Sequence, residues 1–133
     1  MNRLVVDLPY EVVCSKNKAF GVRGGRIYST GVKKQSLKHI ENITRTAMHA
    51  QGTKFEKRKI WLSILVEKPH HRGDAVNVVD VLCDGLKKGI DVDDKWFSIS
   101  KLDWLINKTG KCRIIVDLIQ YPDKDKAYEI GNI

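Results

Sequence analysis

Four stretches of the chain carry the apolar pattern of β-strands. Arg3 to Leu8 alternates apolar and polar residues and ends at Pro9, which cannot continue a strand ladder. Lys59 to Glu67 is rich in β-branched and aromatic residues, which favour strands. Trp96 to Ile106 and Cys112 to Gln120 predict two further strands, joined by a short turn-like segment.

Two other stretches have helical spacing. From Val32 to about Gln51 the apolar residues recur at near-helical intervals, and Gly52 stands where a helix would stop. A second helix is predicted from Asp74 to about Lys88. Gly89 is expected to end it, and the two lysines in its last turn complement the helix dipole.

The predicted elements define one domain. Residues 15–30 are expected to form a basic, glycine-containing loop that leads into a short strand near Arg26 to Ser29. The resulting order is strand, strand, helix, strand, helix, strand, strand. This order favours an α/β fold of α+β-like character, in which a mixed β-sheet carries two main helices, over a regular alternation of strands and helices. The length of 133 residues fits a single domain, 1–133.

Composition narrows the class of partner. The net charge of +8 and the pI near 9.5 predict attraction to nucleic acid or to an anionic membrane surface. No apolar run approaches ~20 residues, and the start of the chain has too short an apolar core for a signal peptide, so we expect a cytoplasmic protein with no membrane partner. Cys14, Cys83 and Cys112 are far apart and odd in number, which favours neither a disulfide framework nor a zinc site.

Acidic residues are concentrated in one window of this basic chain. Asp74 to Asp94 holds six of the 16 carboxylates, and with Lys87 and Lys88 counted its net charge is −4, so the rest of the chain carries +12. Carboxylates hold divalent cations, whereas Lys and Arg hold phosphates. A compact negative site inside a positive body is therefore what a metal-dependent enzyme acting on a polyanion needs.

The predicted second helix arranges these carboxylates. Its apolar positions cluster on one side, toward the sheet, while Asn77, Asp80 and Asp84 fall together on the opposite side. After the helix, the chain can turn back and bring Asp93 and Asp94 near this row. A polar row on a surface helix is commonly only its solvated face. The like charges of Asp80 and Asp84 argue against that interpretation, because they repel each other one turn apart.

If the carboxylates converge, their hard oxygen ligands favour Mg²⁺, with Mn²⁺ as a substitute, over zinc. Such ions activate water and stabilise the leaving oxygen of a phosphodiester. His70 and His71 precede Asp74 and are candidates for ligands, bases or phosphate contacts. The sequence contains no Walker loop, no G-x-S-x-G motif and no Cys–His pairing to support another chemistry.

The spacing of the acidic residues is similar to a known family pattern. Asp74-Ala75-Val76-Asn77 is followed by Asp84 and then by Asp93-Asp94. This resembles the RusA-type Holliday junction resolvases, small homodimeric endonucleases common in prophages, whose core is an Asp-x-Asp-Asn opening a helix, an Asp further along it and an Asp-Asp pair after it. The likeness covers roughly residues 3–120. It includes the proline-ended first strand, the Ser15-Lys16-Asn17 segment, a strand at Tyr28 and the long helix after it.

Val76 departs from this family pattern, because it stands where a metal-binding Asp is expected. Asp80, on the row with Asn77 and Asp84, could supply the missing charge. It occupies about the position at which the family tends to have a catalytic lysine. We favour a rebuilt site over lost activity, because a decaying site has little reason to gain an Asp.

The resemblance implies a Mg²⁺-dependent, structure-selective endodeoxyribonuclease that resolves four-way Holliday junctions by paired nicks in DNA recombination and repair. Its partner would be branched double-stranded DNA in a bacterial cell or phage-infected host, and a homodimer would place one active site on each of two opposing strands. The implied metal ligands are Asp74, Asp80, Asp84, Asp93 and Asp94, with Asp74, Asp80, Asp94 and Asn77 as the catalytic group, and DNA contacts are expected from Lys16, Lys18, Arg23, Arg26 and Arg72.

Two alternatives stay open at this point. The first is a non-catalytic DNA-binding or regulatory module that kept the fold but lost metal binding because Val76 replaces a ligand. The second is an RNA-associated or ribosome-associated basic domain, which leaves the acidic window without an explanation.

Overall fold

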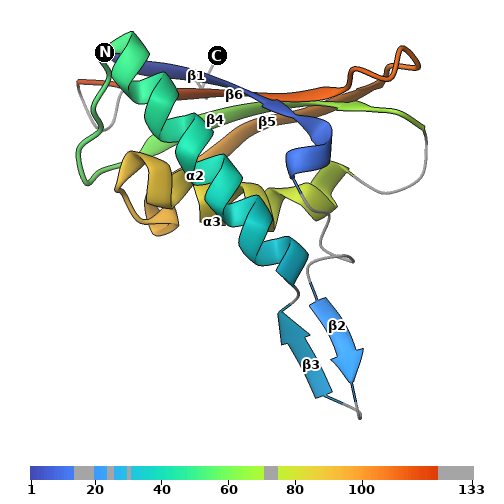
Figure 1. The fold of residues 1–133 in the computed structure, drawn as a ribbon. Coiled ribbons are helices and arrows are strands. Elements are labelled where there is room, and N and C mark those ends of the chain that lie inside the picture. Colours follow the sequence, from blue (N-terminus) through green and yellow to red (C-terminus); the bar gives the residue numbers. More distant parts are fainter. Residues whose placement is uncertain (14–19, 24–25, 30, 71–74, 123–133) are drawn as a thin grey trace.

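The computed structural model describes residues 1–13, 20–23, 26–29, 31–70 and 75–122. Four strands form one mixed sheet in the order β1-β6-β4-β5, in which β4 and β5 are parallel and the other neighbours antiparallel. Two helices pack on this sheet (Figure 1), which confirms the predicted mixed sheet with two main helices. The strands are β1 (Asn2–Pro9), β4 (Ile60–Lys68), β5 (Phe97–Ile106) and β6 (Arg113–Gln120), and the helices are α2 (Gly31–Gln51) and α3 (Val79–Ile90).

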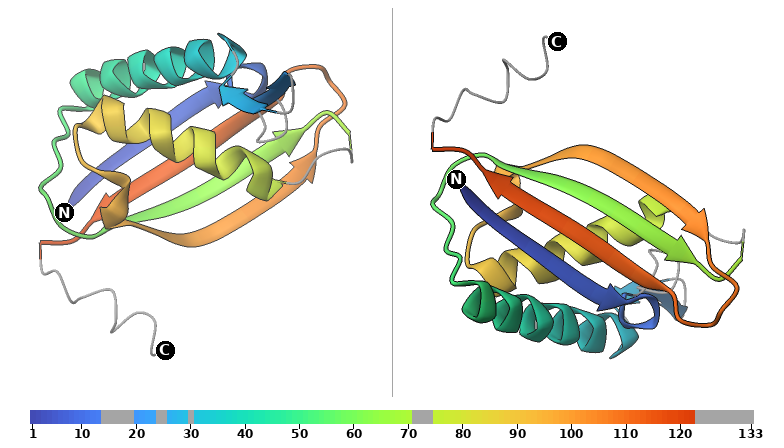
Figure 2. Two further views of the ribbon diagram at one scale, coloured as in Figure 1. Left: turned by 90° about the horizontal axis from the view of Figure 1, so that it is seen from below. Right: turned by 90° about the horizontal axis from the view of Figure 1, so that it is seen from above.

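Alternation along the strands explains the core. Every second residue of β1 and β6 is buried, as expected when one face of a sheet packs against other elements and the other faces outward. Both helices lie side by side on the same face of the sheet, and the opposite face carries no helix in the part of the chain that the structure describes (Figure 2). Fully buried side chains from the two layers include Leu4, Ile64, Val116, Ile40, Leu82 and Leu86.

The two helices run parallel and approach closely. Cβ atoms added at Gly85 and Gly89 would lie 2.5 Å from Ile40 Cβ and 2.6 Å from Thr44 Cβ, respectively. Residues four apart share one side of a helix, so α3 presents a glycine surface to α2. Gly89 therefore lies within α3 and serves helix packing, whereas the predicted role of helix stop was wrong. The helix ends instead at Ile90, and the next residue, Asp91, has a left-handed backbone with a φ of 59°.

Two further boundaries differ from expectation. A 3₁₀ turn, η2 (Ala75–Val78), precedes α3, so the α-helix begins later than predicted. The segment expected as a loop contains β2 (Phe20–Arg23), which pairs with β3 (Arg26–Ser29) in a separate hairpin. Consecutive strands β5 and β6 do not pair with each other, because β4 lies between them.

The C-terminal end of α2 covers the outer edge of β1. Gln51 Nε2 donates to the Val5 carbonyl at 2.8 Å, and its Oε1 accepts from the Val5 amide at 3.1 Å. Thr53 Oγ1 donates to the Arg3 carbonyl at 2.8 Å. These bonds satisfy backbone groups that an edge strand otherwise leaves open. Among the described residues, no helix is long and apolar enough to cross a membrane.

Candidate acidic site on α3

The amphipathic sequence of α3 determines which carboxylates face outward. Leu82, Cys83 and Leu86 are buried beneath the helix, as the periodicity predicted. On the other side Asp80 is exposed and Asp84 half-buried, and Asn77 is half-buried in the preceding turn. The predicted polar row is therefore present, although its first member lies in a 3₁₀ turn and not in the α-helix.

A lysine connects this row to the segment after the helix. Lys87 Nζ lies 3.6 Å from Asp84 Oδ1 and 3.8 Å from Asp94 Oδ1. Asp94 opens a short 3₁₀ helix, η3 (Asp94–Trp96), which contacts α3 and leads into β5. The chain thus turns back after α3, as predicted, and places Asp94 beside Asp84, with the Lys87 ammonium close to both carboxylates.

The pKa of the buried Cys83 thiol is affected by the carboxylates near it. Burial, and after it the negative charges of Asp94, Asp84 and Asp80, raises the pKa of Cys83 to about 12. Three carboxylates from α3 and η3 therefore act on one buried atom. At neutral pH the thiol is protonated, and Cys83 packs in the core beneath α3.

Asp93 and Asp94 form a carboxyl pair with opposite tendencies. The pKa of Asp93 lies below its ordinary value, chiefly because the Lys95 amide donates to its carboxylate at 3.1 Å. The pKa of Asp94 is raised, chiefly by burial and then by its hydrogen bond to Asp93. Asp94 is thus the carboxyl that holds a proton more readily, and Asp93 is the one that keeps its charge.

The described residues offer the oxygen atoms that a divalent cation prefers, but their positions match a metal site only in part. Carboxylate oxygens are the ligands that Mg²⁺ prefers. However, no three His, Cys, Asp or Glu side chains among the described residues are placed to hold one metal ion. A bound cation between Asp84 and Asp94 would also have to displace the Lys87 ammonium.

Several predicted site residues fall outside the described ranges. These are Asp74, Lys16, Lys18 and Arg72, together with His71. Arg23 and Arg26 lie opposite each other in the β2–β3 hairpin, although only their backbone is described. Val76, the position of the missing family Asp, is 61% exposed in η2 at the start of the row.

Sequence reasoning missed Lys87 as a member of the site. It was assigned to the helix dipole, although its position three residues after Asp84 and seven after Asp80 places it on the same side of α3. That spacing was visible in the sequence. The contact with Asp94 was not, because it depends on how the chain folds back after Asp91.

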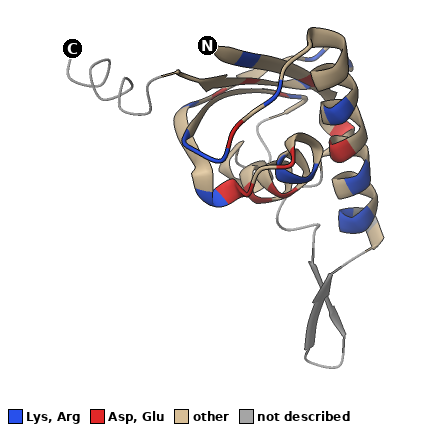
Figure 3. Cartoon of the chain, turned by 90° about the vertical axis from the view of Figure 1, so that its left-hand side faces the viewer, with Lys and Arg blue, Asp and Glu red and all other residues tan. Residues whose placement is uncertain are grey.

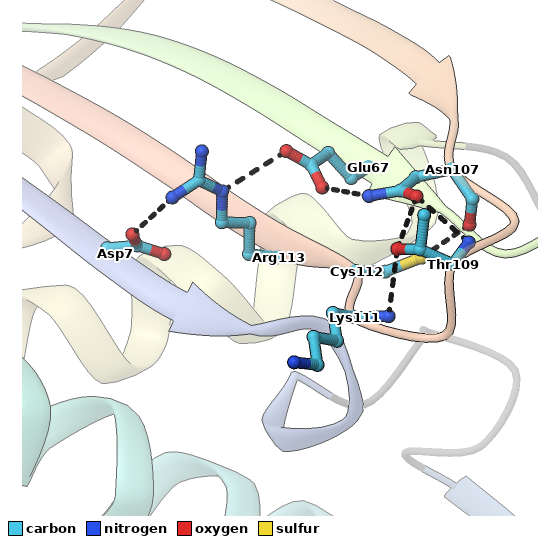
Figure 4. Close-up of polar contacts among 7 residues, drawn as sticks. All are labelled: Asp7, Glu67, Asn107, Thr109, Lys111, Cys112 and Arg113. Atoms are coloured by element: carbon cyan, nitrogen blue, oxygen red, sulfur yellow. Dashed lines mark hydrogen bonds and ion pairs between the residues drawn. The ribbon is translucent and has the colours of Figure 1, made fainter.

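A second polar cluster lies at the far end of the sheet, where β5 connects to β6 (Figure 4). Glu67 Oε1 accepts from Asn107 Nδ2 at 2.8 Å and Glu67 Oε2 from Arg113 Nε at 3.2 Å, and Arg113 also pairs with Asp7 at 3.0 Å. These bonds satisfy a buried carboxylate and tie three strands to the β5–β6 connection. We interpret this cluster as structural.

Comparison with known proteins adds no assignment. No protein-family model matches the chain, and no curated protein matches it. Function is therefore inferred from the residues of the site and from the charge around it.

Proposed function

We propose that this protein is a Mg²⁺-dependent endodeoxyribonuclease that cuts branched DNA, with four-way junctions as its substrate. The observation that carries the proposal is the approach of two carboxylates from separate elements, Asp84 on α3 and Asp94 on η3, to within 3.6 and 3.8 Å of the same Lys87 ammonium, with Asp80 on the same side of α3. Such convergence of like charges is costly in a purely structural helix, and it occurs in a protein of net charge +8.

Each residue has a stated role in this proposal. Asp74, Asp80 and Asp94 hold the divalent ion, Asp84 and Asp93 support them, and Asn77 orients a ligand or water. The ion, when bound, polarises the phosphodiester and activates water. As a ligand Asp94 has to be ionised, so its raised pKa predicts that it binds the ion more weakly as the pH falls. Lys87 balances the charge of the carboxylates and would have to leave them for an ion to be held between Asp84 and Asp94.

The oligomeric state follows from the substrate and stays part of the proposal. An open four-way junction has two-fold symmetry, so a C₂ homodimer presents one acidic site to each of two opposing strands. Two linked nicks then separate the junction into two duplexes. A monomer would make single, unpaired nicks.

Cleavage of a synthetic four-way junction tests the proposal. The junction is compared with a linear duplex of the same sequence, in Mg²⁺ and in EDTA, with wild-type protein and with Asp74→Asn and Asp94→Asn. We expect symmetric nicks in the junction alone, lost in EDTA and in both variants, with binding retained because each variant also removes a negative charge near the phosphates. Junction binding without cutting would overturn the nuclease proposal.

Two observations favour one rival, a non-catalytic DNA-binding module. Lys87 already pairs with both Asp84 and Asp94, and the row begins with an exposed valine at position 76 instead of a carboxylate. Calorimetric titration with Mn²⁺ separates the two functions without any activity assay. Stoichiometric binding that is lost in Asp94→Asn favours the enzyme, and its absence in the wild-type protein favours the module.

A further inference from the structure

The positive charge of the chain is as localised as its negative charge. Residues 31–59 hold eight Lys and Arg and two Glu, so this stretch carries +6 of the net +8. It comprises α2 and the segment that leads to β4. By contrast, residues 75–96, which contain the acidic site, hold five Asp and three Lys. A basic surface and an acidic site are thus built on neighbouring parallel helices.

Three cations and a histidine form one row along the outer side of α2. Lys34, Lys38, Arg45 and His49 follow at intervals of four, seven and four residues, which places them in a narrow strip of an α-helix. All four are exposed, and Figure 3 shows the Lys and Arg positions of α2 in blue. We name these four residues the α2 basic row. It extends over about 22 Å of helix axis.

The middle of the row is held in place by the fold. Arg45 Nη2 donates to the Lys88 carbonyl at 2.8 Å, which ties it to the last turn of α3. Glu41 lies between the cations, 3.5 Å from Lys38 Nζ and 3.7 Å from Arg45 Nη2, and neutralises one charge of the pair. The side chains of Lys38 and Arg45 are nevertheless 68% and 62% exposed, so their charged groups reach solvent.

The surface beside the row is concave. Arg45 and His49 line two adjoining hollows of about 440 and 510 Å³, and Lys54 lines the first of them as well. The apolar side of α2 packs against the core through Ile40 and its neighbours, so this helix has no apolar stripe left for a membrane surface. A row of basic side chains beside shallow hollows fits a polyanion with regularly spaced charges.

We infer that the α2 basic row binds the phosphate backbone of a DNA duplex, and this inference rests on the proposed function. Over about 22 Å one strand of B-DNA presents about six phosphates, at a rise of ~3.4 Å each. Arg45 reaches from α2 to α3, so a duplex on the row passes beside the helix that carries Asp80 and Asp84. The row thereby supplies a backbone contact within the described residues, in addition to the cations predicted from the sequence.

The salt dependence of DNA binding tests the inference. Binding of a fluorescent duplex and of a four-way junction is measured in EDTA at salt concentrations from roughly 50 to 200 mM. Over this range the affinity of a protein that contacts DNA phosphates falls steeply. The test protein is Lys34→Gln/Lys38→Gln. The control is Lys101→Gln/Lys108→Gln, which removes the same charge from two exposed positions on β5 and the connection after it. Circular dichroism and the thermal midpoint verify that both variants fold.

The slope of log K against log salt is negative, and each phosphate contact makes it steeper by about 0.9. We therefore expect the slope of the test protein to be shallower than the wild-type slope by about 1.8. At 0.1 M salt this is a loss of affinity on the order of 60-fold, and the control should keep the wild-type slope. Equal slopes in the test and control proteins would overturn the inference while leaving the proposed function intact. If the wild-type protein binds neither DNA, both fail together.

Discussion

Gly85 of α3 lies directly against Ile40 of α2, so that a Cβ atom added to the glycine would be 2.5 Å from Ile40 Cβ. Ile40 is fully buried, and its β-carbon cannot move without moving the helix. The contact fixes the distance between the helix with the α2 basic row and the helix with the acidic site. Helix packing therefore couples the two surfaces on which the proposed function depends.

We expect Gly85→Ala to destabilise the protein. Overpacking a tight contact costs about 1–3 kcal/mol, while replacing glycine by alanine within a helix returns about 1 kcal/mol, so the net loss is at most about 2 kcal/mol. The free energy of unfolding in urea measures it. Gly31→Ala is the matched control, since an added Cβ there meets nothing within 4 Å. Equal stability of the two variants would show that α2 and α3 separate easily.

The buried carboxylate of Glu67 gives a pH-dependent prediction. Its pKa lies below the ordinary value, first because Asn107 donates to it and then because Arg113 does. The folded state therefore favours the ionised form, and the resulting stability is complete above about pH 4.3 and is lost as the pH falls through the lower folded-state pKa. We expect Glu67→Gln to be less stable than wild type at pH 7, with the difference shrinking below about pH 4.

Nuclear magnetic resonance titration of Glu67 isolates the cause of this shift. Asn107→Ala should raise the pKa of Glu67, because it removes the largest favourable interaction of the ionised carboxylate. Thr109→Ala is the control, since Thr109 bonds to the Asn107 side-chain oxygen but not to Glu67. The link between the pKa of Glu67 and stability would be contradicted by one result. This is a stability difference between wild type and Glu67→Gln that stays constant from neutral to acid pH.

How far the sequence predicts this fold depends on the range of the interactions. The strands β1, β4 and β6 and both helices follow from local periodicity, since their buried residues recur at the expected intervals. The pairing of β6 between β1 and β4 is a choice among distant segments that no local pattern encodes. β2 was missed because its flanking glycines and basic residues resemble a loop.

In the site, too, the features set by local spacing were predictable and those set by distant contacts were not. The row of Asp80 and Asp84 follows from helical spacing, and the return of Asp94 was expected from the acidic pair after the helix. The position of Lys87 relative to Asp94 was not predictable, because it depends on the left-handed backbone at Asp91 that redirects the chain. Likewise, Gly89 looked like a helix stop until its contact with Thr44 gave it a packing role.

Removing the Lys87 ammonium should strengthen binding of a divalent cation. Two ion pairs to half-exposed carboxylates are worth about 0.2–1 kcal/mol each, so we expect Lys87→Gln to tighten Mn²⁺ binding roughly 2- to 30-fold. Isothermal titration calorimetry measures the affinity directly. Lys88→Gln is the control, because it removes an equal charge from the next residue, which is exposed. If both variants bind Mn²⁺ with equal affinity, Lys87 does not compete with the ion.

Val76→Asp tests whether a missing carboxylate limits the site. Residue 76 is 61% exposed at the start of the row, so the substitution should change stability by less than about 0.5 kcal/mol. A further oxygen ligand one turn before Asp80 should raise Mn²⁺ affinity, or junction cleavage in Mg²⁺, by roughly 10- to 100-fold. Val76→Asn is the matched control, because it has similar size and polarity without the charge. A gain confined to Asp identifies the absent carboxylate as the limiting feature. No gain over Asn would mean that Asp80 already supplies that charge or that the site holds no metal, and Mn²⁺ titration of the wild-type protein decides between these two.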